Sequence, residues 1–94
     1  MNTWTFSGEI VKVTEITNSN KFRAAITIKG LVSGKDIDNP FVEFSCMIPV
    51  KLWNRKIKLY KNIEVTGHFE NWVRYTSGGN YKNTLSRIAD AITM

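Results

Sequence analysis

The chain has 94 residues, of which 43% are hydrophobic and 22% are charged, and it carries a formal net charge of +5. This length allows one small domain, residues 1–94, with a single core, and the composition is that of an ordinary globular chain. No apolar run reaches the roughly 20 residues that a membrane-spanning helix needs, and the single cysteine, Cys46, excludes an internal disulfide.

A switch of parity marks the first predicted strand, residues 3–14. Apolar side chains occupy even positions up to Ile10 and odd positions from Val11 onward. Such a switch indicates a bulge or bend near residues 8–10, which a strand needs in order to curve around a barrel. A polar turn is predicted at residues 17–20.

The second predicted strand, residues 21–29, alternates cleanly. Phe22, Ala24, Ile26 and Ile28 take the inward positions. Its outward positions include the cations Lys21, Arg23 and Lys29. The pattern therefore predicts a strand with one core face and one cationic face.

A loop rich in Gly, Ser, Asp and Asn is predicted at residues 30–40, before a third strand at 41–49. Alternation in that strand places Phe44 and Cys46 in the core. Residues 51–61 follow with Trp53, Ile57 and Tyr60 at helical spacing, which is consistent with a short helix or an irregular connector. This connector carries five basic residues and no acidic residue.

The fourth predicted strand, residues 62–71, continues into an aromatic arm at 70–83. A turn at 77–80 folds this arm back on itself, so that it is a hairpin. The returning strand begins at Tyr81. Its apolar positions near the end also fit a helical period, so a terminal helix is an alternative to a bulged strand.

The arm interleaves flat and cationic side chains. Its aromatic residues are Trp72, Tyr75 and Tyr81, and its cations are Arg74 and Lys82. Trp72 and Arg74 share one parity and Tyr75 has the other. Aromatic faces stack on bases of any kind, and cations contact phosphates, so this pattern is typical of a surface for single-stranded nucleic acid. Cross-strand packing within the hairpin is the alternative.

The net charge lies wholly in the second half of the chain. Residues 1–50 hold five basic and five acidic groups, whereas residues 51–94 hold eight basic groups against three acidic ones. This asymmetry favours a polyanion as the partner. His68 and Cys46 are each the only residue of their type, so the sequence predicts no metal site, no cofactor and no enzyme.

The order of strands, connector and long hairpin is that of an OB-fold, an all-β, five-stranded Greek-key barrel. Within it, five segments resemble the successive strand signatures of bacterial and phage single-stranded DNA-binding proteins (SSB) and of the related primosomal protein. These segments are Phe6-Ser7-Gly8-Glu9-Ile10, Ala24-Ala25-Ile26-Thr27-Ile28, Val42-Glu43-Phe44, Ile63-Glu64-Val65-Thr66-Gly67-His68-Phe69 and Ile88-Ala89-Asp90-Ala91-Ile92.

The resemblance implies a homodimer or homotetramer that wraps single-stranded DNA. It also implies that an aromatic base platform falls on Phe44, a position that alternation assigns to the core, and that others fall on Trp72 or Tyr75. The sequence ends without the acidic tail that is usual in this family, which favours a tailless relative.

We therefore expect a cytoplasmic protein that binds single-stranded DNA with little sequence preference in replication or recombination. Its expected binding residues are Trp72, Arg74, Tyr75, Tyr81, Lys82, Phe44, Lys21, Arg23 and Lys29. Two alternatives remain open. One is a primosome or replisome adaptor that acts mainly through contacts with replication or recombination proteins, and the other is an RNA-binding OB module.

Overall fold

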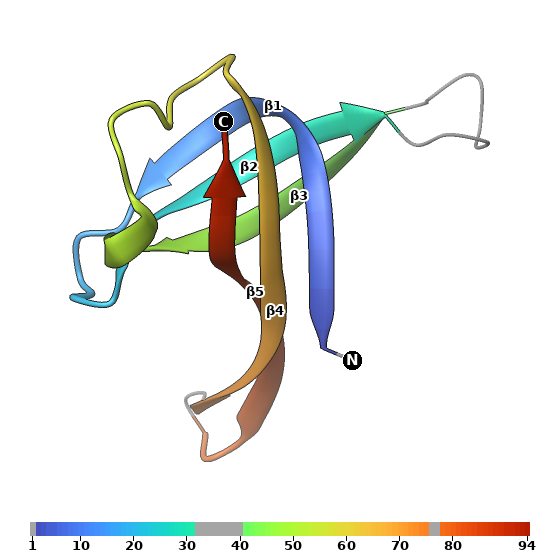
Figure 1. Ribbon diagram of the computed structural model, residues 1–94. Helices are drawn as coiled ribbons and strands as arrows, with labels where there is room; N and C mark the ends of the chain where they lie inside the picture. The colour runs from blue at the N-terminus through green and yellow to red at the C-terminus, as the bar shows by residue number, and fades with distance from the viewer. Residues whose placement is uncertain (1, 32–40, 76–77) are drawn as a thin grey trace.

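Five strands form a closed barrel in the computed structural model, which describes residues 2–31, 41–75 and 78–94 (Figure 1). The strands are β1 (Thr3–Glu15), β2 (Phe22–Leu31), β3 (Phe41–Pro49), β4 (Asn62–Tyr75) and β5 (Tyr81–Thr93). Their order around the barrel is β1-β2-β3-β5-β4, and β4 pairs again with β1. The pairs are antiparallel except for a short parallel contact of β3 with β5, where Met47 lies opposite Ile88. This arrangement confirms the predicted OB-fold.

Bulges redirect side chains on β1 and β5. On β1 the pairing with β2 shifts between Ile10 and Lys12, so Val11 is the extra residue. On β5 the pairing with β4 shifts in the same way and leaves Asp90 as the extra residue. The predicted bend in the first strand is confirmed, one residue later than expected. The alternative of a terminal helix is wrong, because β5 continues as a strand to Thr93.

The core consists of the inward positions of the strands. Its largest fully buried side chains are Ile10, Ile26, Ile28, Ile48 and Val65, all β-branched residues that suit a pleated surface. Trp4 also lies in the core and donates from Nε1 to the carbonyl oxygen of His68 at 3.0 Å. A Cβ at Gly67 would meet both the Ile88 carbonyl oxygen and the Trp4 ring, so glycine is what allows this close packing.

The connector between β3 and β4 contains only one turn of 3-10 helix, η1 (Val50–Leu52), and residues 53–61 are irregular. The predicted short helix is thus formed, although only as η1, and the residues after it extend the β1–β4 ladder instead. Ile10 donates its N–H to the Lys61 carbonyl at 2.9 Å and accepts from the Tyr60 N–H at 2.8 Å. Ile57 is buried, whereas Tyr60 is 73% exposed and has a left-handed φ of 69°.

The β4–β5 hairpin extends well beyond the barrel as the predicted arm (Figure 1). Gly78 and Gly79 form its tip with φ values of 106° and 83°, a conformation that favours glycine. The first residue of the predicted turn, Ser77, and most of the predicted loop at 30–40 lie outside the described residues. Within the described part of the chain, no helix is long and apolar enough to cross a membrane.

Candidate nucleic-acid interface

The outward positions of β2 and β3 form one continuous surface, called here the β2–β3 face. It consists of Arg23, Ala25, Thr27 and Lys29 on β2 and of Phe41, Glu43, Ser45 and Met47 on β3. Short side chains form its floor, where the hydroxyls of Thr27 and Ser45 lie 2.9 Å apart. Lys12 of β1 lies opposite Thr27 in the register and adds a cation to the edge of this face.

A cation lies over an aromatic ring at each end of the β2–β3 face. The Lys29 ammonium lies 4.8 Å from the centre of the Phe41 ring, and the Arg23 guanidinium lies 5.1 Å from the Trp53 ring. The two cations are six residues apart on one strand, which corresponds to roughly 20 Å. Arg23 also donates to a Glu15 carboxylate oxygen at 2.8 Å, so Lys29 is the less engaged of the two.

Beside the floor, β5 borders a hollow of about 160 Å³ whose lining includes Ser45, Leu85 and Arg87. The Arg87 guanidinium lies 4.6 Å from the centre of the Phe44 ring and donates to the Ser45 carbonyl at 3.4 Å. Phe44 is half-buried and stacks on Phe6, with 4.8 Å between ring centres. Its role as a base platform stays a prediction, since Phe6 and Arg87 already lie against its ring.

Trp72 lies at the base of the arm beside the turn that precedes β2. Its ring is 5.8 Å from the Phe22 ring, and its Nε1 donates to a carboxylate oxygen of Glu70 at 3.0 Å. Lys21 lies in the turn rather than in β2, with its ammonium 5.4 Å from the centre of the Phe22 ring. Trp72 pairs with Thr84, so it occupies the opposite face of the arm from Leu85.

Farther along the arm, the predicted site residues pair with one another in register. Arg74 lies opposite Lys82, and Tyr75 lies opposite Tyr81. Tyr81 is 65% exposed. The side chains of Arg74, Tyr75 and Lys82 lie outside the part of the chain that the structure describes. Because neighbouring positions on a strand alternate, the register agrees with the predicted separation of the arm into two faces.

His68 lies between two carboxylates where the arm leaves the barrel. Its Nε2 is 2.8 Å from Glu70 and its Nδ1 is 2.8 Å from Asp90. Hydrogen bonds to Glu70, which has the larger effect, and to Asp90 raise the pKa of His68 above its ordinary value. The hydrogen bond from His68 lowers the pKa of Glu70. Among the described residues, no group of three or more His, Cys, Asp or Glu side chains is arranged to hold a metal ion.

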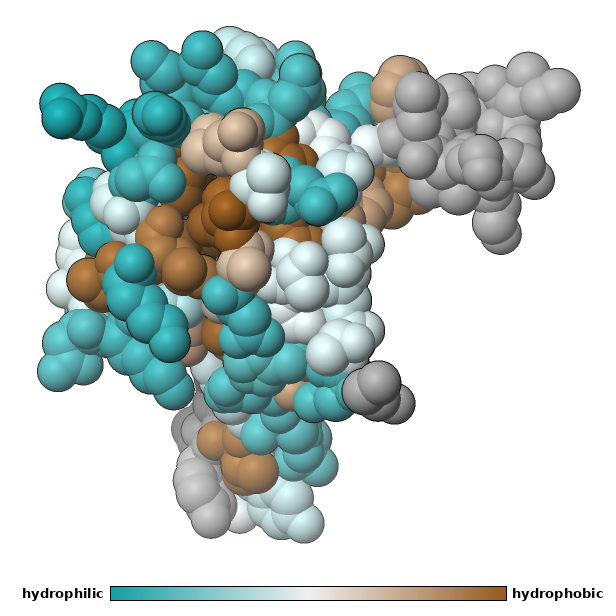
Figure 2. Space-filling view, in the orientation of Figure 1, coloured by the Kyte–Doolittle hydropathy of each residue, from teal (hydrophilic) through white to brown (hydrophobic). Residues whose placement is uncertain are grey.

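Four of the five basic residues of the connector gather at the end of the barrel opposite the arm, where hydrophilic side chains cover the surface (Figure 2), whereas Lys51 lies at the base of the arm. Arg55, Lys56, Lys58 and Lys61 line a hollow of about 540 Å³ together with Asn62 and Met94. Arg74 and Lys82 of the arm are therefore not part of this group, whereas Lys29 lines a neighbouring hollow that shares Asn62 and Met94 with it.

Sequence reasoning missed three residues of the interface. Lys12 faces outward only because Val11 is a bulge residue, and Arg87 has a defined face only once β5 is known to be a strand. Phe41 was detectable, since alternation in the third strand already places it outward. Trp4 is buried in the core, and Trp53 lies half-buried against it.

Comparison with known proteins supports the fold rather than a sequence family. No family model matches the sequence, and no curated protein matches it either. Solved structures do match: the mitochondrial single-stranded DNA-binding protein Rim1 of S. cerevisiae aligns with a TM-score of 0.62 at 17% identity, over 98% of this chain and 92% of Rim1. The Plasmodium falciparum SSB, in complex with single-stranded DNA, aligns with a TM-score of 0.57 at 10% identity, over 98% of this chain and 92% of that one.

The barrel is therefore an OB-fold, and among OB-folds it has the architecture seen in single-stranded DNA-binding proteins. The structural likeness spans nearly the whole chain, the arm included. It agrees with the resemblance drawn from the strand signatures.

Proposed function

We propose that this protein binds single-stranded DNA with little sequence preference. The observation that carries the proposal is the β2–β3 face, where a floor of short side chains is flanked by a cation on an aromatic ring at each end. The corresponding strands of OB-folds bind oligonucleotides. The structural likeness to the Plasmodium falciparum SSB, which was solved with single-stranded DNA, supports the same partner.

In this proposal the phosphates follow the cations and the bases stack on the rings. Arg23 and Lys29 contact phosphates over the β2–β3 face, and Phe41 offers a half-exposed ring beside Lys29. The DNA strand continues past Lys21 and Trp72 to the arm, where the further contacts are with Arg74, Tyr75, Tyr81 and Lys82. Neither stacking nor phosphate contact depends on which base is present, so binding tolerates any sequence.

The proposal includes self-association into a homodimer or homotetramer. Val73 and Leu85 are 54% and 65% exposed, and the register places both on one face of the arm. Apolar side chains in such a position suit a contact between two copies of the chain. Light scattering at micromolar concentrations tests this, and a monomer throughout the range would contradict it. Action in replication or recombination, together with proteins of those processes, is part of the same proposal.

A titration of intrinsic tryptophan fluorescence with oligo(dT) tests the function. If about five phosphates are neutralised, the logarithm of affinity falls against the logarithm of salt with a slope of roughly −3.5. That slope is about a hundredfold loss of affinity between 50 and 200 mM salt. A matched RNA oligomer separates an RNA-binding module, because RNA alone has the 2′-hydroxyl. Failure to bind either polymer at low salt would refute the proposal and favour a protein adaptor.

A further inference from the structure

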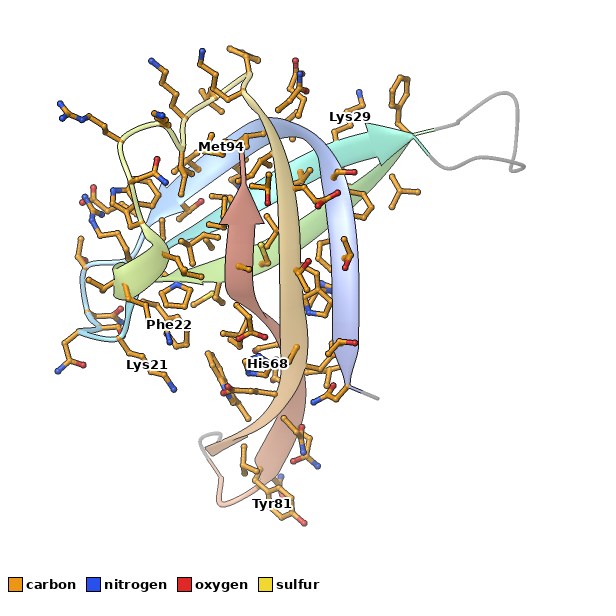
Figure 3. The ribbon with its side chains drawn as sticks, viewed as in Figure 1. Lys21, Phe22, Lys29, His68, Tyr81 and Met94 are labelled. Carbon is orange, nitrogen blue, oxygen red and sulfur yellow. The ribbon has the colours of Figure 1, made fainter. Side chains whose placement is uncertain are left out.

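His68 links strands β4 and β5 at the base of the arm. It belongs to β4, and its ring contacts Glu70 on its own strand and Asp90 on β5, each at 2.8 Å. Asp90 reaches it because of the β5 bulge, which keeps Ile88 and Ala89 buried and directs the next residue outward. Figure 3 shows His68 on the side of the arm that faces Lys21 and Phe22.

The two contacts favour the protonated form of His68. A carboxylate oxygen only accepts hydrogen bonds, and a neutral imidazole has a single N–H to donate. Both ring nitrogens lie at hydrogen-bonding distance from carboxylates, and both can donate only when the ring is an imidazolium. The raised pKa of His68 agrees with this geometry. Loss of the proton would leave one of the two carboxylates facing a lone pair.

Glu70 links the protonation of His68 to the position of the Trp72 side chain. One oxygen of Glu70 accepts from His68, and the other accepts from Trp72 Nε1 at 3.0 Å. The indole is thus held with its edge on Glu70 and its ring against Phe22. Released from His68, Glu70 would turn toward solvent or toward Lys21, which already lowers its pKa.

The net charge at the base of the arm also depends on the protonation of His68. A hollow of about 550 Å³ at the arm base is lined by Lys21, Lys51, His68, Glu70 and Asp90. With His68 protonated these five groups sum to +1, and with His68 neutral they sum to zero. A phosphate backbone passing from Lys21 to the arm meets an attractive site only in the first case.

We propose that His68 is a positioning residue for single-stranded DNA: as an imidazolium it holds Glu70 and Trp72 in place and offsets two carboxylates that would repel phosphates. This inference rests on the proposed function and adds a pH dependence to it. Affinity for DNA falls as pH rises and His68 loses its proton. Loss of one charge corresponds to roughly a fivefold lower affinity at 100 mM salt.

The test is an oligo(dT) titration of the full chain between pH 5.5 and 9 at constant ionic strength. His68 is the only histidine in the sequence, so His68→Gln removes this titration and leaves the α-amino group as an internal control. We expect the wild type to lose about fivefold in affinity across this range and His68→Gln to give a flat profile. Asp90→Asn, which keeps the size of the side chain, should move the wild-type midpoint to lower pH.

Two further measurements separate the possible failures. Fluorescence of the DNA-free protein, with Trp72→Phe subtracted, should change over the same pH range in the wild type and not in His68→Gln. Circular dichroism confirms folding at each pH. If all variants bind oligo(dT) with one common pH profile, the role of His68 is refuted and DNA binding stands. If no variant binds at any pH, both proposals are refuted.

Discussion

Variants of Lys29 and Phe41 can separate the contribution of phosphate contact from that of base stacking at one place on the surface. Their side chains are in contact, with 4.8 Å from the ammonium to the ring centre, and they belong to neighbouring strands. Lys29→Gln removes one phosphate contact and should flatten the salt slope by about 0.7 for single-stranded DNA. Phe41→Leu removes a stacking platform, which costs about 1–3 kcal/mol and leaves the slope unchanged.

These magnitudes give distinct curves when salt rises from 50 to 200 mM. The wild type should lose roughly 2.6-fold more affinity than Lys29→Gln over this range, whereas Phe41→Leu should run parallel to the wild type at weaker binding. The double variant adds the coupling of the pair, about 0.5–1 kcal/mol for an exposed cation over a ring. Oligo(dT) titrations at four salt concentrations measure all three quantities.

Lys58→Gln is the matched control, because Lys58 is an exposed lysine of the connector and does not belong to the β2–β3 face. It should leave the slope unchanged for an oligomer short enough to cover only the β2–β3 face. An unaltered affinity of Phe41→Leu, or equal changes of slope in Lys29→Gln and Lys58→Gln, would mean that DNA does not follow this face.

Other predictions concern the barrel itself. Gly67→Ala should destabilise the fold by about 1–3 kcal/mol in urea unfolding, because the new methyl group would overlap the Ile88 carbonyl; a stable variant would contradict this packing. Burial raises the pKa of Cys46 to about 12, so a thiol reagent at pH 8 should modify it only after unfolding. The contribution of His68 to stability should be complete below its ordinary pKa of 6.5 and should fade as pH rises through its raised pKa. The contribution of Glu70 should be complete above its ordinary pKa of 4.5 and should fade as pH falls through its lowered pKa. Thermal unfolding from pH 3 to 9 that shows no loss on the alkaline side would contradict the statement on His68.

The strand pattern was predictable because most of the barrel obeys simple alternation. Phe22 to Ile28 alternate without interruption, and the structure buries the inward set and exposes or half-exposes the rest. The fold also followed from the order of strands and the long hairpin. Alternation holds through Arg23, the extra residue of β2 against β3, but it failed at the bulges of Val11 and Asp90, since a bulge cannot be located to one residue from hydrophobicity alone.

The site was less predictable, because it depends on which outward positions lie side by side. The sequence placed Arg23 and Lys29 on the same face of one strand, and the structure agrees. The sequence could not show that Arg23 contacts both Glu15 and Trp53. Nor could it show the hydrogen bond from Trp72 to Glu70, since these contacts depend on side-chain positions in the folded molecule. The contacts of His68 with Glu70 and Asp90 depend on the bulge at Asp90. That bulge lies on β5, whose sequence also fitted a helix.

The bulge at Val11 also affects how β1 should respond to mutation. Before it the even positions face the core, from Trp4 to Ile10, and after it the odd position Val13 does. Tolerance to polar substitution should therefore change parity within this single strand. Deletion of Val11 would leave Lys12 opposite Thr27 and Val13 opposite Ile26 in a regular ladder, so both side chains would keep their faces and β1 would lose only its local bend. The extra residue should therefore matter for the curvature of the barrel rather than for which side chains are buried.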